Sequence, residues 1–229
     1  MTISAATPAL TGPVEDYLKA VFELETSGRA AGTNEIAAAL RIAPASVSGM
    51  MRRLADQGLI AHERYRGVRL TELGRRAALR TIRRHRVIEA YLTTALGYAW
   101  DLVHDEAERL EHAASDELVD RMAAAIGEPA TDPHGAPIPT RDGLVDDRAL
   151  ATLADVEPGG RVCIERVGDE DPQRLRYLAE LGITPGTRVD VIARAPFDGP
   201  ITLRLAPDAS ERAIGPALAR HIYVAPVAG

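Results

Sequence analysis

The stretch from His104 to His112 constrains the fold more than any other feature of the chain. It places His104, Glu108, Glu111 and His112 at offsets of zero, four, seven and eight residues. On a helix that turns about 100° per residue, these four side chains lie on one arc roughly 100° wide. A helix packed against a core is apolar along such an arc, whereas this one carries imidazoles and carboxylates, which are ligands of divalent metals.

A second pair of the same kind, His85 and Glu89, stands four residues apart upstream. A single pair of this sort is typical of a solvated helix face with ion pairs. Two such clusters within about thirty residues favour metal coordination over that alternative. The sequence therefore predicts helices that hold metal ions.

Length and composition set broad limits. A chain of 229 residues, 46% of them hydrophobic, can form one large or several small globular domains. Its one cysteine, Cys163, excludes an intramolecular disulfide framework. Because the N-terminal residues lack a signal-peptide pattern and no apolar run approaches transmembrane length, we expect a cytoplasmic protein with no membrane partner.

The charge is unevenly distributed along the chain. The net charge is −6, but residues 41–90 hold twelve arginines against four acidic residues, a net +8. Residues 91–147 hold three arginines against thirteen acidic residues, a net −10. This pattern indicates an anion-binding module followed by a cation-binding one.

Residues 1–76 are predicted to form a winged helix-turn-helix DNA-binding domain. The pattern gives helices over 13–25 and 36–40, the second capped by Thr33 or Asn34. A third helix over 44–55 begins with a proline, and two short strands, 59–64 and 67–70, complete the wing. The next helix is expected to start at residues 71–74.

In that architecture the third helix enters the major groove of double-stranded DNA. Candidates for phosphate or base contacts on this helix are Ser46, Ser48, Gly49, Arg52 and Arg53, and those at the tip of the wing are Arg64, Tyr65 and Arg66. The serines offer hydrogen bonds, the glycine permits close backbone approach, and the arginines neutralise phosphates.

Residues 77–147 are predicted to be helical, and residues 148–229 to form a small SH3-like β-barrel. The middle part is expected to hold helices over 80–96, 102–114 and 115–126, the last with Ser115 as its cap. His134 lies in the turn-rich loop that follows and is interpreted as a structural or solvated residue. The last part alternates apolar and polar residues over 161–167, 188–193, 201–205 and 222–224, with one helix over 171–181.

Taken together, the chain resembles the diphtheria toxin repressor family of metal-dependent transcriptional repressors. The motifs that carry the resemblance are Glu15-Asp16-Tyr17-Leu18, Arg84 to Glu89, His104 to His112, and Asp132 to Pro139. The resemblance implies a homodimer built on the middle domain, operator DNA as the partner, and an SH3-like, FeoA-like C-terminal domain.

The resemblance also implies two metal sites. One would use Asp16, Glu108, Glu111 and His112, and the other His85, Glu89 and His104. The C-terminal domain would add a ligand to the second site, for which the candidates are Glu170, Asp171 and Gln173. In related manganese sensors, His85 instead completes the first site.

Departures from the family bear on the metal and on DNA reading. Iron-responsive members carry Met and Cys where this chain has Asp16 and Glu108, and oxygen ligands favour Mn²⁺ over softer metals. We therefore expect Mn²⁺ as the cofactor, with Fe²⁺ as the alternative. Lys19 stands where short manganese sensors have a glutamate ligand, so a two-manganese cluster of their type is not expected. Gly49 replaces a longer polar side chain, so base reading is expected to rest on Ser46, Ser48 and DNA shape.

Other functional classes fit the sequence less well. A metallohydrolase would use similar ligands, but the chain has no His-Glu-x-x-His motif. A metal store would not need the basic block. A metal-independent helix-turn-helix regulator would need a pocket for an organic ligand and would bind DNA equally well in the presence of a chelator.

Overall fold

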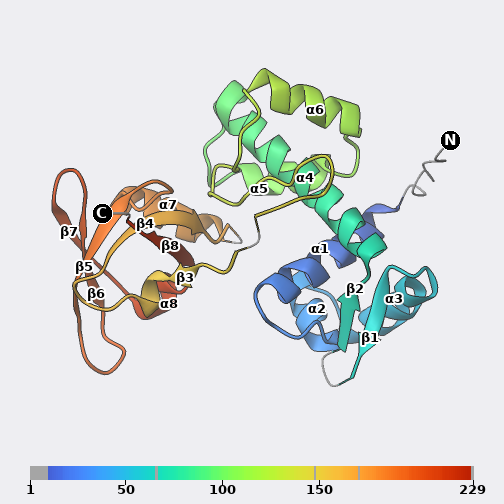
Figure 1. Cartoon of the computed structure of the whole chain (residues 1–229), viewed down its shortest axis with the longest axis horizontal. Helices are drawn as coiled ribbons and strands as arrows, with labels where there is room; N and C mark the ends of the chain where they lie inside the picture. Colours follow the sequence, from blue (N-terminus) through green and yellow to red (C-terminus); the bar gives the residue numbers. More distant parts are fainter. Residues whose placement is uncertain (1–9, 65–66, 147, 170, 228–229) are drawn as a thin grey trace. The chain divides into compact units, whose positions relative to one another are not determined.

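The computed structural model describes residues 10–64, 67–146, 148–169 and 171–227. Contacts divide it into two compact units. One consists of Met1–Arg83 with Pro139–Asp147, and the other of Arg84–Ile138 with Arg148–Gly229. The predicted class, mainly helical with a winged helix and a C-terminal SH3-like domain, is confirmed (Figure 1).

The first unit contains the winged helix-turn-helix. Its elements are α1 (Gly12–Thr26), α2 (Thr33–Leu40), α3 (Pro44–Asp56), β1 (Ile60–Glu63), β2 (Gly67–Leu70) and the first half of α4 (Glu72–Leu96). Buried residues of all six elements share one core, to which Leu18, Ile36, Val47 and Leu54 contribute fully buried side chains. The linker, residues 139–147, also belongs to this unit. Val145 packs against the core, and Arg83 Nη1 donates to the Pro139 carbonyl at 2.9 Å.

One expectation for this region is wrong. The N-cap of α2 is Gly32, and Thr33 is already the first helical residue, so neither Thr33 nor Asn34 caps the helix. The helix start expected at residues 71–74 is confirmed, and the periodic segment 80–96 continues the same helix, since α4 runs unbroken from Glu72 to Leu96. Nothing in the sequence stops a helix there, since 72–96 contains no proline and its single glycine, Gly74, lies in the first turn. Gly74 has a packing role, because a Cβ there would lie 1.9 Å from the Leu59 carbonyl oxygen.

The second unit begins with the rest of α4, followed by α5 (Val103–Leu110) and α6 (Asp116–Ala125). Ser115 caps α6 as predicted, its hydroxyl accepting from the Leu118 amide at 3.2 Å. Helix α5 ends at Leu110, four residues earlier than predicted, so Glu111 is its C-cap and His112 lies in the following turn. The four residues of the opening motif therefore do not all share one helical arc.

The C-terminal sheet has the strand order β3-β8-β4-β5-β6-β7, with every pair antiparallel. Its strands are β3 (Ala151–Thr152), β4 (Arg161–Val167), β5 (Arg188–Arg194), β6 (Ile201–Leu205), β7 (Ser210–Ile214) and β8 (Ile222–Pro226). A 3₁₀ turn (Leu153–Asp155), α7 (Pro172–Leu181) and α8 (Pro216–Ala219) complete the domain. Strands β3 and β7 and helix α8 were not predicted from the sequence; β7 has a polar sequence because it is an exposed edge strand.

Candidate metal centres and nucleic-acid interface

Apolar packing between two helices brings the two histidine–glutamate pairs together. The contact is a small buried cluster formed by Ile88 and Leu92 of α4 with Val103 and Ala107 of α5. His85 and Glu89 lie one turn apart on α4, and His104 and Glu108 one turn apart on α5. Because both pairs follow the helical period, the packing sets one pair opposite the other.

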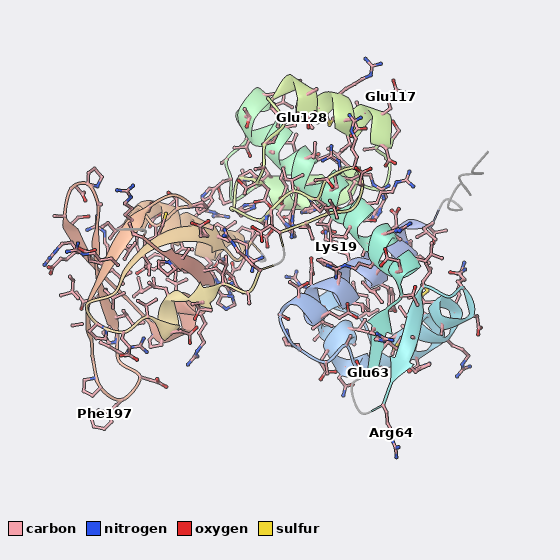
Figure 2. All side chains as sticks on the ribbon, viewed as in Figure 1. Lys19, Glu63, Arg64, Glu117, Glu128 and Phe197 are labelled. Atoms are coloured by element: carbon pink, nitrogen blue, oxygen red, sulfur yellow. The ribbon has the colours of Figure 1, made fainter. Side chains whose placement is uncertain are left out.

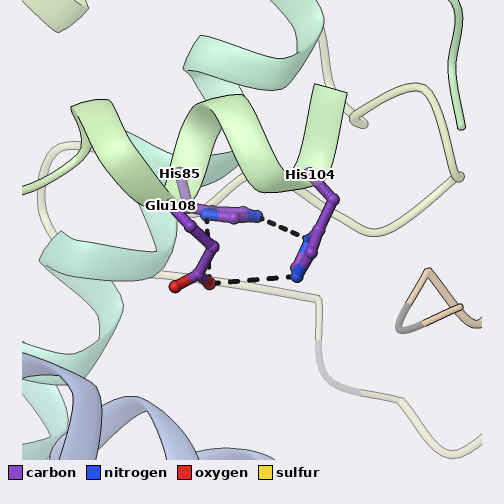
Figure 3. A group of neighbouring side chains, drawn as sticks. All are labelled: His85, His104 and Glu108. Atoms are coloured by element: carbon purple, nitrogen blue, oxygen red, sulfur yellow. Dashed lines mark hydrogen bonds and ion pairs between the residues drawn. The ribbon is translucent and has the colours of Figure 1, made fainter. Parts of the chain in front are cut away.

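His85, His104 and Glu108 point toward one another, with dashed lines marking the contacts between them (Figure 3). His85 Nε2 lies 3.0 Å from Glu89 Oε1 and 3.2 Å from His104 Nδ1. His104 Nδ1 lies 3.3 Å from the same Glu89 oxygen. Glu108 Oε1 is 3.8 Å from His85 Nδ1 and 3.9 Å from His104 Nε2. Two imidazole nitrogens and a carboxylate oxygen at such distances require a shared proton or a cation.

Glu111 adds a second carboxylate to His85. Its Oε2 lies 2.5 Å from His85 Nδ1, and its Oε1 lies 3.6 Å from His112 Nε2. Glu111 is fully buried, whereas His112 is exposed. His85 thus stands between the carboxylates of Glu89 and Glu111, so both ring nitrogens face acidic groups.

A second group of ligands gathers around the other oxygen of Glu89. One donor atom each of Glu89, Asp132, His134 and Asp169 lies within 4.8 Å of the others. His134 Nδ1 is 3.8 Å from Glu89 Oε2 and 3.9 Å from Asp169 Oδ2. Glu89 therefore serves both groups, with Oε1 toward His85 and His104 and Oε2 toward His134.

The loop that carries Asp132 and His134 is shaped by its own backbone. Asp132 Oδ1 accepts from the amides of His134 at 2.8 Å and Ala136 at 2.9 Å, and its Oδ2 lies 3.7 Å from Arg86 Nε, too far for a hydrogen bond. Gly135 has a φ of +87°, and a Cβ at this position would lie 1.9 Å from the Glu165 carbonyl oxygen. Only glycine allows this approach, and the Val167 amide, which donates to the His134 carbonyl at 2.9 Å, holds β4 beside the loop.

Three potential metal-ligand atoms in this second group are buried without a hydrogen-bond partner. They are Glu89 Oε2, Asp132 Oδ2 and His134 Nδ1. His134 Nε2 lies 2.8 Å from the Trp100 carbonyl, which can only accept, so Nε2 carries a proton. In the neutral ring, the lone pair of Nδ1 then faces two carboxylates. Because buried polar atoms are rarely left unsatisfied, the arrangement fits a bound divalent cation.

In the metal-free protein, protons take up part of this negative charge. Burial opposes charge on His134, but the carboxylates of Glu89, Asp169 and Asp132 outweigh it and raise the pKa of His134 to about 9. Burial and the negative charge of Glu89 raise the pKa of Asp132 to about 7. Burial also opposes ionisation of Glu89, yet the surrounding imidazoles hold its pKa well below the usual range.

Most of the residues nominated from the sequence as ligands lie in the second unit. His85, Glu89, His104, Glu108 and Glu111 converge there as described. Asp16 is a half-buried residue of α1, in the other unit, so its part in a shared site stays a prediction.

The C-terminal candidates lie differently. Glu170 is outside the described residues. Asp171 caps α7, accepting from the Gln173 amide at 2.9 Å, and Gln173 is exposed. The carboxylate that reaches the cluster belongs to Asp169.

Sequence reasoning thus missed Asp132, His134 and Asp169. His134 was interpreted as a structural or solvated residue, but it is fully buried and faces carboxylates. A signal was present in Asp132-Pro-His134-Gly, two ligand-type side chains beside a glycine in a short loop. What the sequence could not supply was their partner Asp169, which belongs to the C-terminal domain.

The winged domain presents the predicted DNA contacts on its surface. Val47, Met51 and Leu54 bury one side of α3, and the candidates Ser46, Ser48, Gly49, Arg52 and Arg53 are all exposed. Arg64 extends outward from the wing, just after β1 (Figure 2). Tyr65 and Arg66 lie outside the described residues. An amphipathic α3 with serines and arginines on its open side suits contact with a DNA groove.

Three family models match the chain. "Iron dependent repressor, N-terminal DNA binding domain" covers residues 9–68, "Iron dependent repressor, metal binding and dimerisation domain" covers residues 71–140, and "FeoA domain" covers residues 151–226. Among curated proteins, the iron-dependent repressor IdeR of Mycobacterium tuberculosis is 33% identical over 199 residues, spanning 80% of this chain and 84% of its own. The diphtheria toxin repressor of Corynebacterium diphtheriae is 30% identical over 208 residues, spanning 85% and 89%.

Solved structures agree. A manganese-dependent transcriptional repressor in complex with manganese has a TM-score of 0.88 and 40% identity, covering 93% of this chain and 100% of its own. ScaR with bound Zn²⁺ has a TM-score of 0.81 and 32% identity, covering 93% and 99%. These matches confirm the resemblance drawn from the four motifs. The chain belongs to the diphtheria toxin repressor family of metal-dependent transcriptional repressors.

Proposed function

We propose that this repressor is activated by Mn²⁺ and that it then binds operator DNA as a homodimer. The observation that carries the proposal is the group of buried donors around Glu89, three of whose atoms have no hydrogen-bond partner. Such atoms are costly to bury, and a divalent cation would satisfy them together.

The chemistry of the donors supports manganese over the alternative, Fe²⁺. Every ligand in the two described groups is a carboxylate oxygen or an imidazole nitrogen. Oxygen-rich sets suit Mn²⁺, whereas thiolate and thioether ligands suit softer metals. A relative of known structure is named a manganese-dependent repressor, although curated relatives carry the name iron-dependent.

The proposed mechanism follows from where the ligands belong. When bound, a divalent cation supplies positive charge among donors that otherwise repel one another. Asp16 belongs to α1 of the DNA-binding unit, and the family resemblance groups it with Glu108, Glu111 and His112 of the helical domain. Holding these ligands together would fix α1, and with it the recognition helix α3, to the helical domain. Metal and operator would then each tighten the binding of the other.

A homodimer is supported by exposed apolar side chains in the helical domain. Leu96 is 57% exposed and Leu102 54% exposed, and Tyr98, Leu110 and Leu118 are also open to solvent. Large apolar residues grouped on one domain typically mark an interface, and the family model that matches this region names it a dimerisation domain. We further propose that the functional domains are residues 1–76, 77–147 and 148–229.

Among the described residues, none of the helices has both the length and the hydropathy needed to cross a bilayer. We propose a purely regulatory role without enzymatic activity, because the acidic and imidazole groups of the site face one another inside the protein.

Fluorescence anisotropy with the DNA upstream of its own gene tests the proposal. The titrations compare chelator, Mn²⁺ and anaerobic Fe²⁺. Binding only with metal, at lower Mn²⁺ than Fe²⁺, would support it, and the reverse order would assign the protein to iron. Equal binding in chelator would favour a metal-independent regulator.

Asp16→Ala should abolish metal-activated binding while leaving the dimer folded. A normal manganese response by this variant would refute the role of α1.

A further inference from the structure

The outer edge of the wing is closed by a side chain. One edge of β2 pairs with β1, with Ile60 opposite Leu70 and His62 opposite Val68. On the opposite edge, the Val68 amide donates to the Ala31 carbonyl at 3.1 Å. Two residues further along this edge, the Leu70 amide donates to Glu25 Oε1 at 2.7 Å. Because amides two residues apart point the same way along a strand, Glu25 takes the place that a backbone carbonyl would hold in a longer pairing strand.

Glu25 stands where a carboxylate is otherwise disfavoured. It lies in the last turn of α1, which is the negative end of the helix dipole. It is also half-buried, and burial raises its pKa although the Leu70 amide and the charges of Arg75 and Arg69 act in the opposite direction. Neither the helix dipole nor solvation explains an acidic residue here. The contact with β2 does, since hydrogen bonds to a charged acceptor are the stronger kind.

A second contact joins the same elements. The guanidinium of Arg75, in the first turns of α4 just after β2, lies 4.9 Å from the centre of the Phe22 ring on α1. The end of α1 is thus tied both to the last residue of the wing and to the helix that follows it. The other end of α1 carries Asp16, about two and a half turns away.

We propose that Glu25 is a positioning residue for DNA binding, whose carboxylate makes the wing move together with α1. This inference rests on the proposed function, in which Asp16 connects α1 to the metal. A displacement of α1 then reaches the DNA by a second route, through the wing and Arg64, as well as through α3. Without the acceptor, the described backbone contacts at this edge of the wing are those with Ala31, which lies in the loop after α1, and α1 meets the wing through side-chain packing in the shared core.

The matched substitutions are Glu25→Gln and Glu25→Met. Glutamine keeps an oxygen acceptor for the Leu70 amide, whereas methionine keeps a similar length and helix propensity but offers only a weak acceptor. Glu72→Met is the control, because Glu72 is an exposed carboxylate of the same unit that forms an ion pair with Arg76 at 3.0 Å. Each protein is titrated with operator DNA at several salt concentrations in Mn²⁺, and with Mn²⁺ alone by calorimetry.

We expect Glu25→Met to bind operator roughly tenfold more weakly, as the loss of one charge-assisted hydrogen bond implies. Its salt slope should fall by about one, because wing–phosphate contacts are lost. Glu72→Met should behave as wild type in both, and Glu25→Gln should lose less than Glu25→Met, because it keeps an acceptor but not the charge. Mn²⁺ binding without DNA should be unchanged in all. A general loss of folding would instead weaken metal binding as well.

Wild-type operator binding by Glu25→Met, or an equal loss in Glu25→Gln and Glu25→Met, would overturn the inference and leave the proposed function intact. Failure of wild type to respond to Mn²⁺ would overturn the proposed function itself. Should Glu25→Met not fold, hydrogen exchange of the wild type decides. Leu70 and Val68 amides should be similarly protected with and without Mn²⁺, and rapid exchange at Leu70 alone would refute the link.

Discussion

His134 is expected to exchange a proton for a metal ion, and His134→Gln isolates that exchange. With a pKa of about 9, the ring is charged in the metal-free protein at neutral pH. At pH 7.5 such a group is about 97% protonated, so a cation bound at Nδ1 releases about one proton from it. Asp132, with a pKa of about 7, adds about 0.2 of a proton under the same conditions.

The same competition sets the pH dependence of metal binding. At pH 7.5, about 1.5 units below the pKa of His134, displacing its proton costs about 2 kcal/mol, or roughly thirtyfold in affinity. The contribution of His134 should therefore tighten metal binding about tenfold per pH unit up to about pH 9. Glutamine can still donate to the Trp100 carbonyl but carries no proton to lose, so His134→Gln should flatten this dependence.

Isothermal titration calorimetry with Mn²⁺ in PIPES, HEPES and Tris measures the protons released. Wild type should release about one proton more per metal at pH 7.5 than His134→Gln. His62→Gln, at an exposed position of β1, serves as the matched control and should release as many protons as wild type. Equal release by wild type and His134→Gln would show that His134 is not charged in the metal-free protein and does not exchange with the metal.

Three further predictions concern stability and assembly. The pKa of His134 is higher in the folded protein than in the unfolded chain, so its charge stabilises the metal-free protein. This stabilisation is complete below about pH 6.5, and about 3 kcal/mol is lost as the pH rises through about 9. Chemical unfolding in chelator, compared with His134→Gln, measures this loss. Gly135→Ala should lower the free energy of unfolding by about 2 kcal/mol or more and weaken metal binding, because its Cβ meets the Glu165 carbonyl. Gly97→Ala, with a φ of +71° but open space around it, is the control and should show only the smaller backbone strain in thermal melts. Leu102→Glu should dissociate the proposed dimer in sedimentation experiments, while Leu144→Glu, 70% exposed in the linker, should not; a dimeric Leu102→Glu protein would place the interface elsewhere.

Local patterns in the sequence determined the elements and the chemistry of the first ligand group. The helical period of residues 13–25, Pro44 at a helix start and the short wing strands identified the winged helix without tertiary information. The pairs His85/Glu89 and His104/Glu108 were readable because residues four apart share one face of a helix. The end of α5 was misjudged, since helical periodicity does not reveal where a helix stops.

Only the tertiary structure decided which residues complete the second group. Asp132, His134 and Asp169 come from a loop and from the segment after β4, and no periodic pattern relates them to Glu89 on α4. They meet because Gly135 allows β4 to approach the loop and because the Val167 amide fixes it there. Glu25 illustrates the same limit, since its partner is a backbone amide 45 residues away. Sequence spacing carries information within one helix or strand, whereas contacts between elements depend on how their apolar faces pack.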